Sequence, residues 1–230
     1  MSETIALVPA RGGSKRIPRK NIREFLGVPA LTRVVQTLLS SGVFDRVVVS
    51  TDDDEIAEIG RSSGAEVPFI RPAALSDSFT GARPVIQHAV NTLTLPESTN
   101  LGVFYPTAVL TTRDDVTKSF SLFDGEECDF VLSVAEFPAP VERSLTVKAD
   151  GYVRVREPEY IGSRSQDLPQ SYHDIGQFYW GSVASWKTDL AVVQSACCAY
   201  VVDQWRAVDI DTPADWRRAE LVYRMLHEQS

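Results

Sequence analysis

The chain has 230 residues, of which 43% are hydrophobic and 23% charged, as is typical of a folded globular protein and not of a disordered one. Its 31 acidic residues outnumber the 23 basic ones, which gives a net charge of −8 and argues against a general binder of nucleic acids or anionic membranes. The N-terminus lacks the basic region of a signal peptide, and no stretch approaches the roughly 20 apolar residues of a membrane span. We therefore expect a single-domain cytoplasmic protein with neither nucleic acid nor membrane as its partner.

Short apolar runs alternate with segments of helical periodicity along most of the chain. Strands are predicted over residues 4–8, 46–50, 67–70, 101–105, 129–135, 178–183 and 200–202. Helices are predicted from Pro29 to a stop at Gly42, from the acidic run 51–54 to a stop at Gly64, over 84–95, over 114–123, and from Pro213 onward with Thr212 as the N-cap. This alternation predicts an α/β fold with a mostly parallel sheet, whose ligand sites lie beyond the carboxyl ends of the strands.

The pattern changes over residues 137–176. Four prolines interrupt this segment, and two short strand-like pieces flank Asp150-Gly151, a good hairpin turn. We interpret residues 137–176 as a small β-hairpin insertion into the single domain 1–230, lying over one end of the sheet.

The loop after the first predicted strand carries an unusual concentration of positive charge. Six of the chain's basic residues lie within residues 11–23, which contain no acid, and Gly12-Gly13 permits backbone amides to converge on an anion. The dinucleotide-binding and P-loop glycine patterns are both absent. A basic loop of this kind can also be a solvated surface or a nucleic-acid-binding arm, but its place after a buried strand favours a phosphate site.

Two further groups of residues have the chemistry of a site. Asp209 and Asp211 are two positions apart, so that at a strand end both carboxylates can reach one cation such as Mg²⁺, although Asp211 can instead cap the helix that follows. Polar and aromatic side chains near Gly176 suit a sugar ligand, while Phe178 or Trp180 can equally belong to the core. Asp52 can cap the next helix or shape the site, and these alternatives remain equal.

The motif Leu7-Val-Pro-Ala-Arg-Gly-Gly-Ser-Lys-Arg-Ile-Pro-Arg-Lys-Asn21 resembles the signature of the sugar-acid cytidylyltransferases, which activate sialic acids and related nonulosonic acids as CMP conjugates. The resemblance extends in order to the segments 49–52, 64–72 and 209–213, and the block 165–180 is most similar to the branch that acts on pseudaminic acid. It implies a Rossmann-like three-layer sandwich of the nucleotide-diphospho-sugar transferase type. It also implies CTP and a nonulosonic acid as substrates, Mg²⁺ as cofactor and a homodimer, with the insertion as a lid over the sugar or a dimerisation segment.

The same resemblance assigns roles to individual residues. It implies nucleotide binding by Pro9, Ala10, Arg11, Gly12, Gly13, Lys15, Lys20, Asn21, Arg71 and Thr107, and sugar binding by Tyr172, His173, Gln177 and Tyr179. Lys15, Asp209 and Asp211 are implied as catalytic residues, with the two aspartates as the metal ligands. For Arg71 the alternative is a surface ion pair.

The segment Tyr105-Pro-Thr-Ala-Val-Leu-Thr111 departs from the family pattern Gln-Pro-Thr-Ser-Pro-Leu-Arg. Thr107 is retained, but Tyr105 replaces the glutamine that contacts the base, and the arginine is missing. The sequence therefore leaves the mode of cytosine recognition open, together with the choice between pseudaminic acid and sialic acid, legionaminic acid or Kdo. A non-catalytic protein that binds nucleotides or nucleic acids remains the alternative from another class.

Overall fold

The computed structural model describes residues 2–77, 79–123 and 128–227. Its centre is a six-stranded sheet with the strand order β10-β6-β9-β5-β1-β4. These strands are β1 (Thr4–Pro9), β4 (Arg46–Ser50), β5 (Asn100–Phe104), β6 (Phe130–Glu136), β9 (Tyr172–Ser182) and β10 (Cys197–Val201). All pair in parallel except β9, which runs antiparallel to both of its neighbours, β5 and β6. The predicted α/β fold with a mostly parallel mixed sheet is confirmed.

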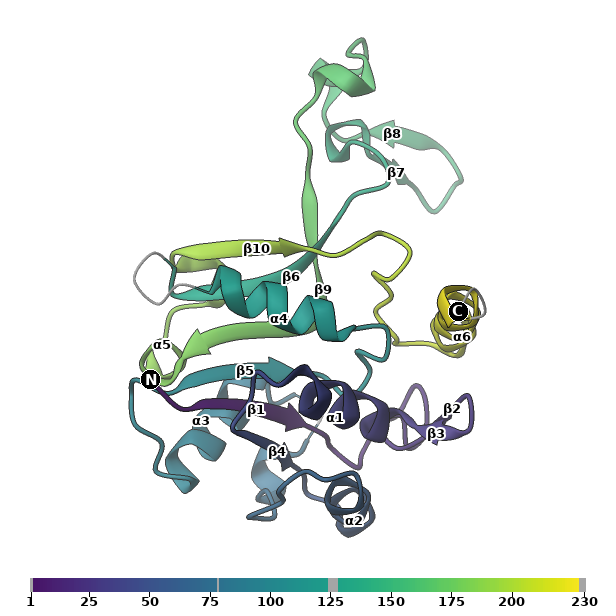
Figure 1. Cartoon of the computed structure of the whole chain (residues 1–230). Helices are drawn as coiled ribbons and strands as arrows, with labels where there is room; N and C mark the ends of the chain where they lie inside the picture. Colours follow the sequence, from purple (N-terminus) through teal and green to yellow (C-terminus); the bar gives the residue numbers. More distant parts are fainter. Residues whose placement is uncertain (1, 78, 124–127, 228–230) are drawn as a thin grey trace.

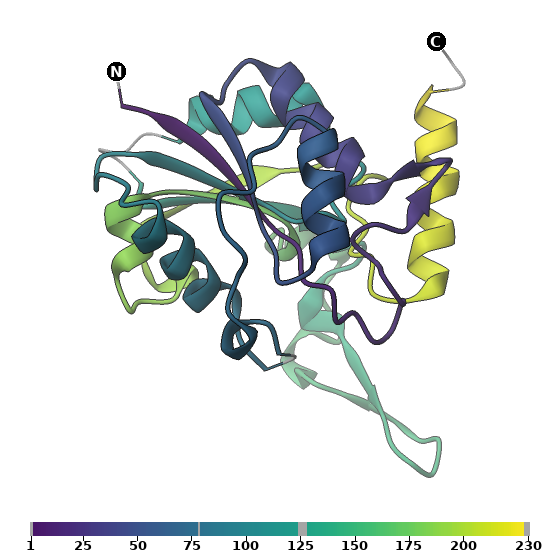
Figure 2. The same ribbon diagram turned by 90° about the horizontal axis from the view of Figure 1, so that it is seen from below.

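Helices cover both faces of this sheet, which gives three layers (Figures 1 and 2). They are α1 (Ala30–Ser41), α2 (Asp54–Ser62), α3 (Ala82–Thr92), α4 (Arg113–Leu122), α5 (Val183–Lys187) and α6 (Pro213–His227). In β1, Ala6 and Val8 pack into the larger core with α1, α4 and α6, while Ile5 and Leu7 pack into a second core with α3 and α5. This alternation follows from the twofold period of a strand whose two faces are both buried.

Local signals explain where several helices begin and end. The left-handed backbone of Gly42, with φ of 70°, ends α1, and the Asp53 side chain caps α2 by accepting the amide of Ile56. At α6, the Thr212 hydroxyl accepts the Asp215 amide, and the Asp215 carboxylate accepts the Thr212 amide in return. Thr212 is thus the N-cap, as predicted, and the alternative that Asp211 caps this helix is wrong.

The strand predicted over residues 67–70 is wrong. This segment follows the edge strand β4 through isolated bridges at Glu66 and Ile70, without a continuous ladder. Pro68 lies between the bridges and has no amide hydrogen to donate. The segment nevertheless brings Arg71 to the end of β4, because the Arg71 amide donates to the Thr51 carbonyl at 2.7 Å.

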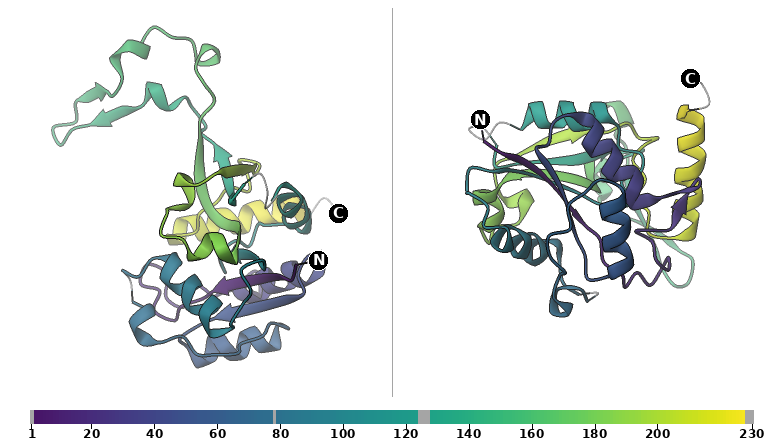
Figure 3. Two further views of the ribbon diagram at one scale, coloured as in Figure 1. Left: turned by 90° about the vertical axis from the view of Figure 1, so that its left-hand side faces the viewer. Right: turned by 60° about the horizontal axis from the view of Figure 1, so that its bottom comes forward.

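The insertion is a hairpin arm, but it does not lie over the sheet. Strands β7 (Leu145–Val147) and β8 (Val153–Val155) flank the predicted turn and pair with each other. Figures 1 and 3 show the arm extending away from the body. Strands β6 and β9 remain paired as far as Glu136 and Tyr172, so the arm begins at the outer end of this pair. The arm spans residues 137–171. The predicted boundary at 176 is therefore too late, since residues 172–176 belong to β9.

Two short strands, β2 (Glu24–Phe25) and β3 (Val28–Pro29), complete the described structure together with five short 3₁₀ turns. In the described part of the chain, every helix falls short of the length and apolar character needed to cross a bilayer.

Candidate functional site

Residues from distant parts of the sequence meet at one edge of the sheet. The parallel strands β1, β4 and β5 end there, at Pro9, Ser50 and Phe104. Because β9 runs in the opposite direction, its first half lies at this edge, where Phe104 of β5 pairs with Phe178. The loop after β1, the Arg71 segment and the start of β9 therefore surround one region beyond the strand ends, where α/β sheets bind their ligands.

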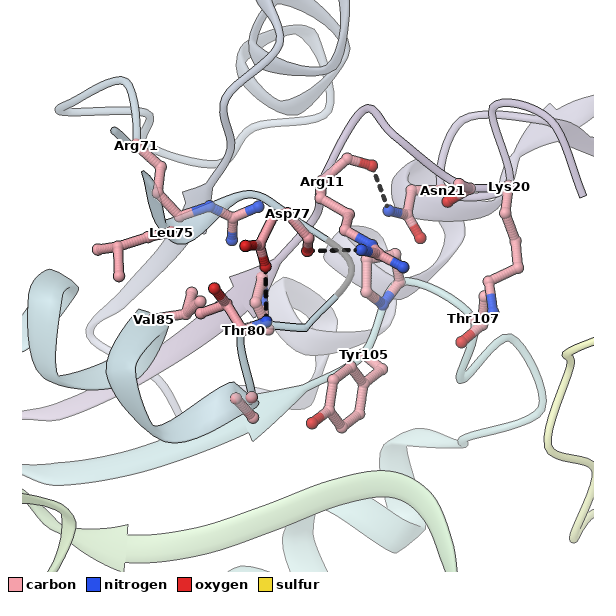
Figure 4. Close-up of a pocket in the computed structure, with 15 residues that line it drawn as sticks. Arg11, Lys20, Asn21, Arg71, Leu75, Asp77, Thr80, Val85, Tyr105 and Thr107 are labelled. Atoms are coloured by element: carbon pink, nitrogen blue, oxygen red, sulfur yellow. Dashed lines mark hydrogen bonds between the residues drawn. The ribbon is translucent and has the colours of Figure 1, made fainter. Parts of the chain in front are cut away.

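A pocket of about 300 Å³ opens at this edge. It is lined by Pro9, Arg11, Ser14, Lys20, Asn21, Arg71, Leu75, Asp77, Thr80, Gly81, Ala82, Val85, Tyr105, Pro106 and Thr107. In Figure 4, Arg71 lies on one side, Lys20 and Thr107 on the other, and Arg11 between them, with Tyr105 below. Three of the charged side chains are cationic and one, Asp77, is anionic, so the pocket has the charge that a polyphosphate requires.

Arg71 is almost fully buried, with 4% of its surface exposed, so the alternative of a surface ion pair is wrong. Its guanidinium donates to Asp52 at 3.3 Å and to the Ser76 hydroxyl at 3.1 Å. Burial lowers the pKa of Arg71, and the Asp52 carboxylate opposes this shift. Asp52 also accepts the Gly12 amide at 3.1 Å. Asp52 therefore shapes the site, while its neighbour Asp53 caps α2.

The start of the loop after β1 is held in place by hydrogen bonds within the loop and to two neighbouring segments. The Asn21 side-chain amide donates to the Arg11 carbonyl at 2.9 Å, and the Arg11 guanidinium donates to the Asp77 carbonyl at 2.7 Å. Ala10 is buried, and its amide donates to the Ser50 carbonyl. A Cβ on Gly12 would lie 2.6 Å from an Asp53 carboxylate oxygen, so any side chain at this position would displace Asp53. Of the predicted nucleotide-binding residues in this part of the chain, Pro9, Arg11, Lys20 and Asn21 line the pocket, whereas the amides of Ala10 and Gly12 bond to Ser50 and Asp52.

Several cations of this loop already have partners within the protein. Arg19 forms ion pairs with Asp53 and Glu55, Arg16 pairs with Asp211 at 2.7 Å, and Arg23 lies over the Trp216 ring. Arg19 has a φ of 55°, a left-handed conformation that is uncommon for arginine and directs the chain back towards α1.

Gly13 and Lys15 lie outside the pocket lining. Lys15 is exposed and forms no hydrogen bond or ion pair among the described residues, so its ammonium is the loop cation without a protein partner there. An added Cβ on Gly13 would meet open space.

Asp209 and Asp211 belong to an extended segment between β10 and α6, and not to a strand end as expected. Asp211 pairs with Arg16 and, at 3.3 Å, with Lys20, whose ammonium also donates to the Ile210 carbonyl. The Asp209 carboxylate forms no hydrogen bond or ion pair within the described residues. Desolvation and the nearby Asp211 carboxylate raise the pKa of Asp209.

These two carboxylates form a weak metal site by themselves. In the described residues, no cluster of three or more acidic, histidine or cysteine side chains is arranged to hold a metal ion. A pair of hard carboxylate oxygens beside a polyphosphate pocket does fit Mg²⁺, which is commonly held by one or two carboxylates together with substrate phosphates and water.

The predicted sugar-binding residues fall into two groups. Tyr179 donates to Asp174 at 2.5 Å and packs edge-to-face with Tyr105, while Tyr172 is exposed and His173 packs against Phe137. Burial and the Asp174 carboxylate raise the pKa of Tyr179 and of Tyr105. Gln177 lies differently, because it is buried and both ends of its amide are bound, to Thr111 and to the Arg206 carbonyl. The structure thus gives Gln177 an internal contact and not an open binding face.

Sequence reasoning did not identify several residues of this region. Asp77 and Thr80 line the pocket from a loop in which the Asp77 carboxylate accepts the Thr80 amide at 2.7 Å (Figure 4). Aspartate is a common turn residue because its side chain accepts a backbone amide two residues on, as Asp77 also does from Phe79 at 2.9 Å. Phe178 and Trp180 are fully buried, which confirms that they belong to the core.

The unusual environment of Asp209 leads to a prediction about stability. Because the pKa of Asp209 is raised above its ordinary value of 3.8, folding favours its protonated form. Its charge therefore costs stability above the raised pKa, and this cost disappears below the ordinary value. We expect Asp209→Asn to unfold at a higher temperature than the original protein near neutral pH. The difference should vanish below pH 3.8 in thermal unfolding followed by circular dichroism. A lower unfolding temperature for the variant near neutral pH would contradict it.

The sequence of this chain is similar to those of known cytidylyltransferases. A family model described as cytidylyltransferase matches residues 5–93. The pseudaminic acid cytidylyltransferase of Campylobacter jejuni serotype O:2 is 34% identical over 99% of this chain and 99% of its own length. The N-acylneuraminate cytidylyltransferase B of Danio rerio is 30% identical over 94% of this chain and 50% of its own length.

The fold also agrees with a solved structure. CMP:2-keto-3-deoxy-manno-octonic acid synthetase in complex with CTP superposes with a TM-score of 0.72. The match covers 98% of this chain and 100% of that one at 14% identity, so it supports the predicted nucleotide-diphospho-sugar transferase-like fold. With full-length identity above 30% to one of its members, this chain belongs to the cytidylyltransferase family.

Proposed function

We propose that this protein transfers CMP from CTP to the anomeric hydroxyl of pseudaminic acid and releases pyrophosphate. The observation that carries the proposal is the cationic pocket of Arg11, Lys20 and Arg71 at the sheet edge that also holds Asp209. The full-length similarity to the C. jejuni pseudaminic acid cytidylyltransferase supports the choice of sugar. Since CTP is an intracellular metabolite, we place the reaction in the cytoplasm.

In this reaction the anomeric oxygen forms a bond to the α-phosphorus while the bond from that phosphorus to the bridging oxygen of the β-phosphate breaks. The hydroxyl proton leaves to solvent or to a nearby base. Such a displacement mainly requires positioning and neutralisation of charge. Arg11 and Arg71 bind the nucleotide, and the exposed ammonium of Lys15 is free to fold onto the triphosphate.

Asp209 and Asp211 would hold Mg²⁺, which when bound neutralises phosphate charge and polarises the oxygens that coordinate it. Asp211 must then give up at least one of its ion pairs with Arg16 and Lys20. The guanidinium of Arg16 and the ammonium of Lys20 become available to the phosphates. Asp209 needs no such exchange, because its carboxylate has no partner within the described residues.

The sugar lies, in our proposal, against the start of β9. Tyr172, His173 and Tyr179 offer aromatic faces and hydrogen-bonding groups there, and Asp174 adds a carboxylate that already accepts the Tyr179 hydroxyl. Gln177 lies behind this surface and supports it. Acylamino and hydroxyl groups of a sugar acid are suited to such a mixture of polar groups and rings.

The test is release of pyrophosphate from CTP in the presence of Mg²⁺ with a panel of pseudaminic acid, sialic acid, legionaminic acid and Kdo. We expect the highest kcat/KM with pseudaminic acid. Preference for another acid of the panel would retain the reaction and correct the substrate. If no member of the panel releases pyrophosphate, the enzyme assignment is wrong. A direct measurement of CTP binding then shows whether the protein binds nucleotides without catalysis or does not bind them.

We further propose that the arm makes this protein a homodimer. The hairpin projects from the body and exposes apolar side chains of Leu145, Val147, Tyr152 and Val153, of which Val147 and Tyr152 are more than 70% exposed. Such a surface in water favours burial against a partner, and a second copy offers the same surface.

Introducing a charge into the arm is expected to break the dimer. Val147→Asp should halve the mass measured by light scattering after size-exclusion chromatography, because a carboxylate would be desolvated at the contact. Leu190→Asp introduces the same charge at another exposed apolar position and should leave the mass unchanged. A dimer that persists in Val147→Asp, or a monomer for the original protein, would contradict the proposal.

A further inference from the structure

The segment that carries Asp209 has little backbone support of its own. It connects β10, which ends at Val201, to α6, which begins at Pro213. Beyond the Val202 amide, which donates to Val134 of β6 at 2.8 Å, it pairs with no strand in the described structure. Val208 and Ile210 are buried in the main core, and the side chain between them, Asp209, is exposed. Since successive side chains of an extended chain point in opposite directions, two apolar anchors hold Asp209 towards the site.

Polar contacts to Asp115, Gln177 and Val208 hold this segment at Arg206. The guanidinium of Arg206 forms a bidentate ion pair with Asp115, in which Nη2 lies 3.0 Å from Oδ1. The Arg206 carbonyl accepts the Gln177 side-chain amide at 2.7 Å and the Val208 amide at 2.9 Å. Both the side chain and the backbone of Arg206 are thus held, three residues before Asp209.

Asp115 is itself held rigidly. It is buried, with 2% of its surface exposed, and accepts hydrogen bonds from the Thr112 amide and hydroxyl in the capping box of α4. Its second oxygen also accepts the Tyr200 hydroxyl at 3.0 Å. Burial opposes its charge, but the hydrogen bonds from Arg206 and Thr112 keep the pKa of Asp115 below its usual value. A carboxylate fixed by Thr112 and Tyr200 is a firm base for the Arg206 fork.

We propose that the Asp115–Arg206 pair is a positioning element for catalysis, which fixes the Asp209 segment at the site edge although neither residue touches the nucleotide pocket. The proposal rests on the proposed function, in which Asp209 is the metal-binding carboxylate. Gln177 serves the same purpose through the Arg206 carbonyl, and it links β9, which carries the sugar-facing residues, to the Asp209 segment.

The main test variant is Arg206→Lys, which keeps the positive charge and loses the planar fork. We expect kcat to fall about 10- to 100-fold and the Mg²⁺ concentration for half-maximal rate to rise, since small displacements of a catalytic group are costly. The Kd for CTP measured without sugar acid should change less than about twofold, because the contacts of Arg11 and Arg71 remain. Amide hydrogen exchange across residues 202–211 should become at least about tenfold faster.

Two control variants separate positioning from general loss of stability. Arg46→Lys breaks another bidentate pair, with Glu66 at 2.9 and 2.7 Å, at the far end of β4. Ser182→Ala removes the hydroxyl cap of α5, at the end of β9 that lies away from the site. Both should lower the unfolding temperature while kcat, the Mg²⁺ dependence and exchange over residues 202–211 stay as in the original protein.

Gln177→Met provides a second variant if Arg206→Lys is not recovered folded, because it removes the other anchor and leaves the ion pair intact. It should shift the same three quantities in the same direction. The inference is overturned if the folded variants match Ser182→Ala and Arg46→Lys in kcat, Mg²⁺ dependence and exchange. An original protein that turns over no sugar acid would refute the proposed function instead, and hydrogen exchange alone would then decide whether Arg206 fixes the segment.

Discussion

Replacing Asp209 by alanine is expected to reduce turnover at least about 100-fold while the protein remains folded, since a metal held at this carboxylate supplies several kcal/mol of charge stabilisation. The fold should survive because the Asp209 side chain is exposed and forms no hydrogen bond or ion pair in the described residues. Binding of CTP in the absence of sugar acid should weaken much less, because the cationic wall of the pocket does not include Asp209. Steady-state pyrophosphate release and calorimetric titration with CTP measure the two effects.

The matched control is Asp114→Ala. Asp114 is an exposed residue of α4 that pairs with Lys118, a surface contact worth at most about 1 kcal/mol. The Asp114→Ala variant should therefore retain full turnover. Wild-type turnover in Asp209→Ala would remove Asp209 from the metal site and leave Asp211 as the candidate ligand.

Replacing Arg71 by methionine is expected to raise the Kd for CTP about 10- to 100-fold. A hydrogen bond to a charged group contributes about 1.5–3 kcal/mol, and every 1.4 kcal/mol is a factor of ten in affinity. Arg71 is held by Asp52 and Ser76 inside the pocket wall, so its guanidinium is positioned before the nucleotide arrives. Calorimetric titration with CTP in the absence of sugar acid measures this effect without turnover.

Arg61→Met is the comparison for that experiment, since Arg61 lies exposed on α2 and contacts only Glu58 at 3.8 Å in the described structure. Its Kd should equal that of the original protein. An unchanged Kd in Arg71→Met, with the protein folded, would assign Arg71 to support of the Asp52 loop alone.

Sequence patterns located most elements because their signals are local. The run Arg46–Ser50 is a strand of the predicted length, and Gly42 ends α1 as expected from its freedom to adopt positive φ. The strand over 67–70 failed because Pro68 breaks its ladder, a constraint visible in the sequence. The direction of the arm was not predictable, since it depends on how far β6 and β9 pair beyond their neighbours.

Within the site, the sequence identified the candidate residues but not the side chains with which they form ion pairs. The loop from residue 11 to 23 was found from its composition, but Arg19 pairs with Asp53 and Lys20 with Asp211, 191 positions away. No local pattern indicates such pairs, because only the complete fold brings these residues together. The same holds for Asp115 and Arg206, which belong to separate elements and join 91 positions apart.

The antiparallel strand β9 has a consequence for the order in which the chain can fold. Strands β5 and β6 follow one another in sequence but do not pair, and β9 fills the space between them. During synthesis, the β4–β1–β5 part and β6 therefore wait for residues 172–182 before they share one sheet. Because joining distant segments closes long loops, we expect the pairing of β9 with β5 and β6 to be the slow step of folding. The strand that carries the sugar-facing residues is thus also the one that completes the sheet, so the site cannot form ahead of the fold.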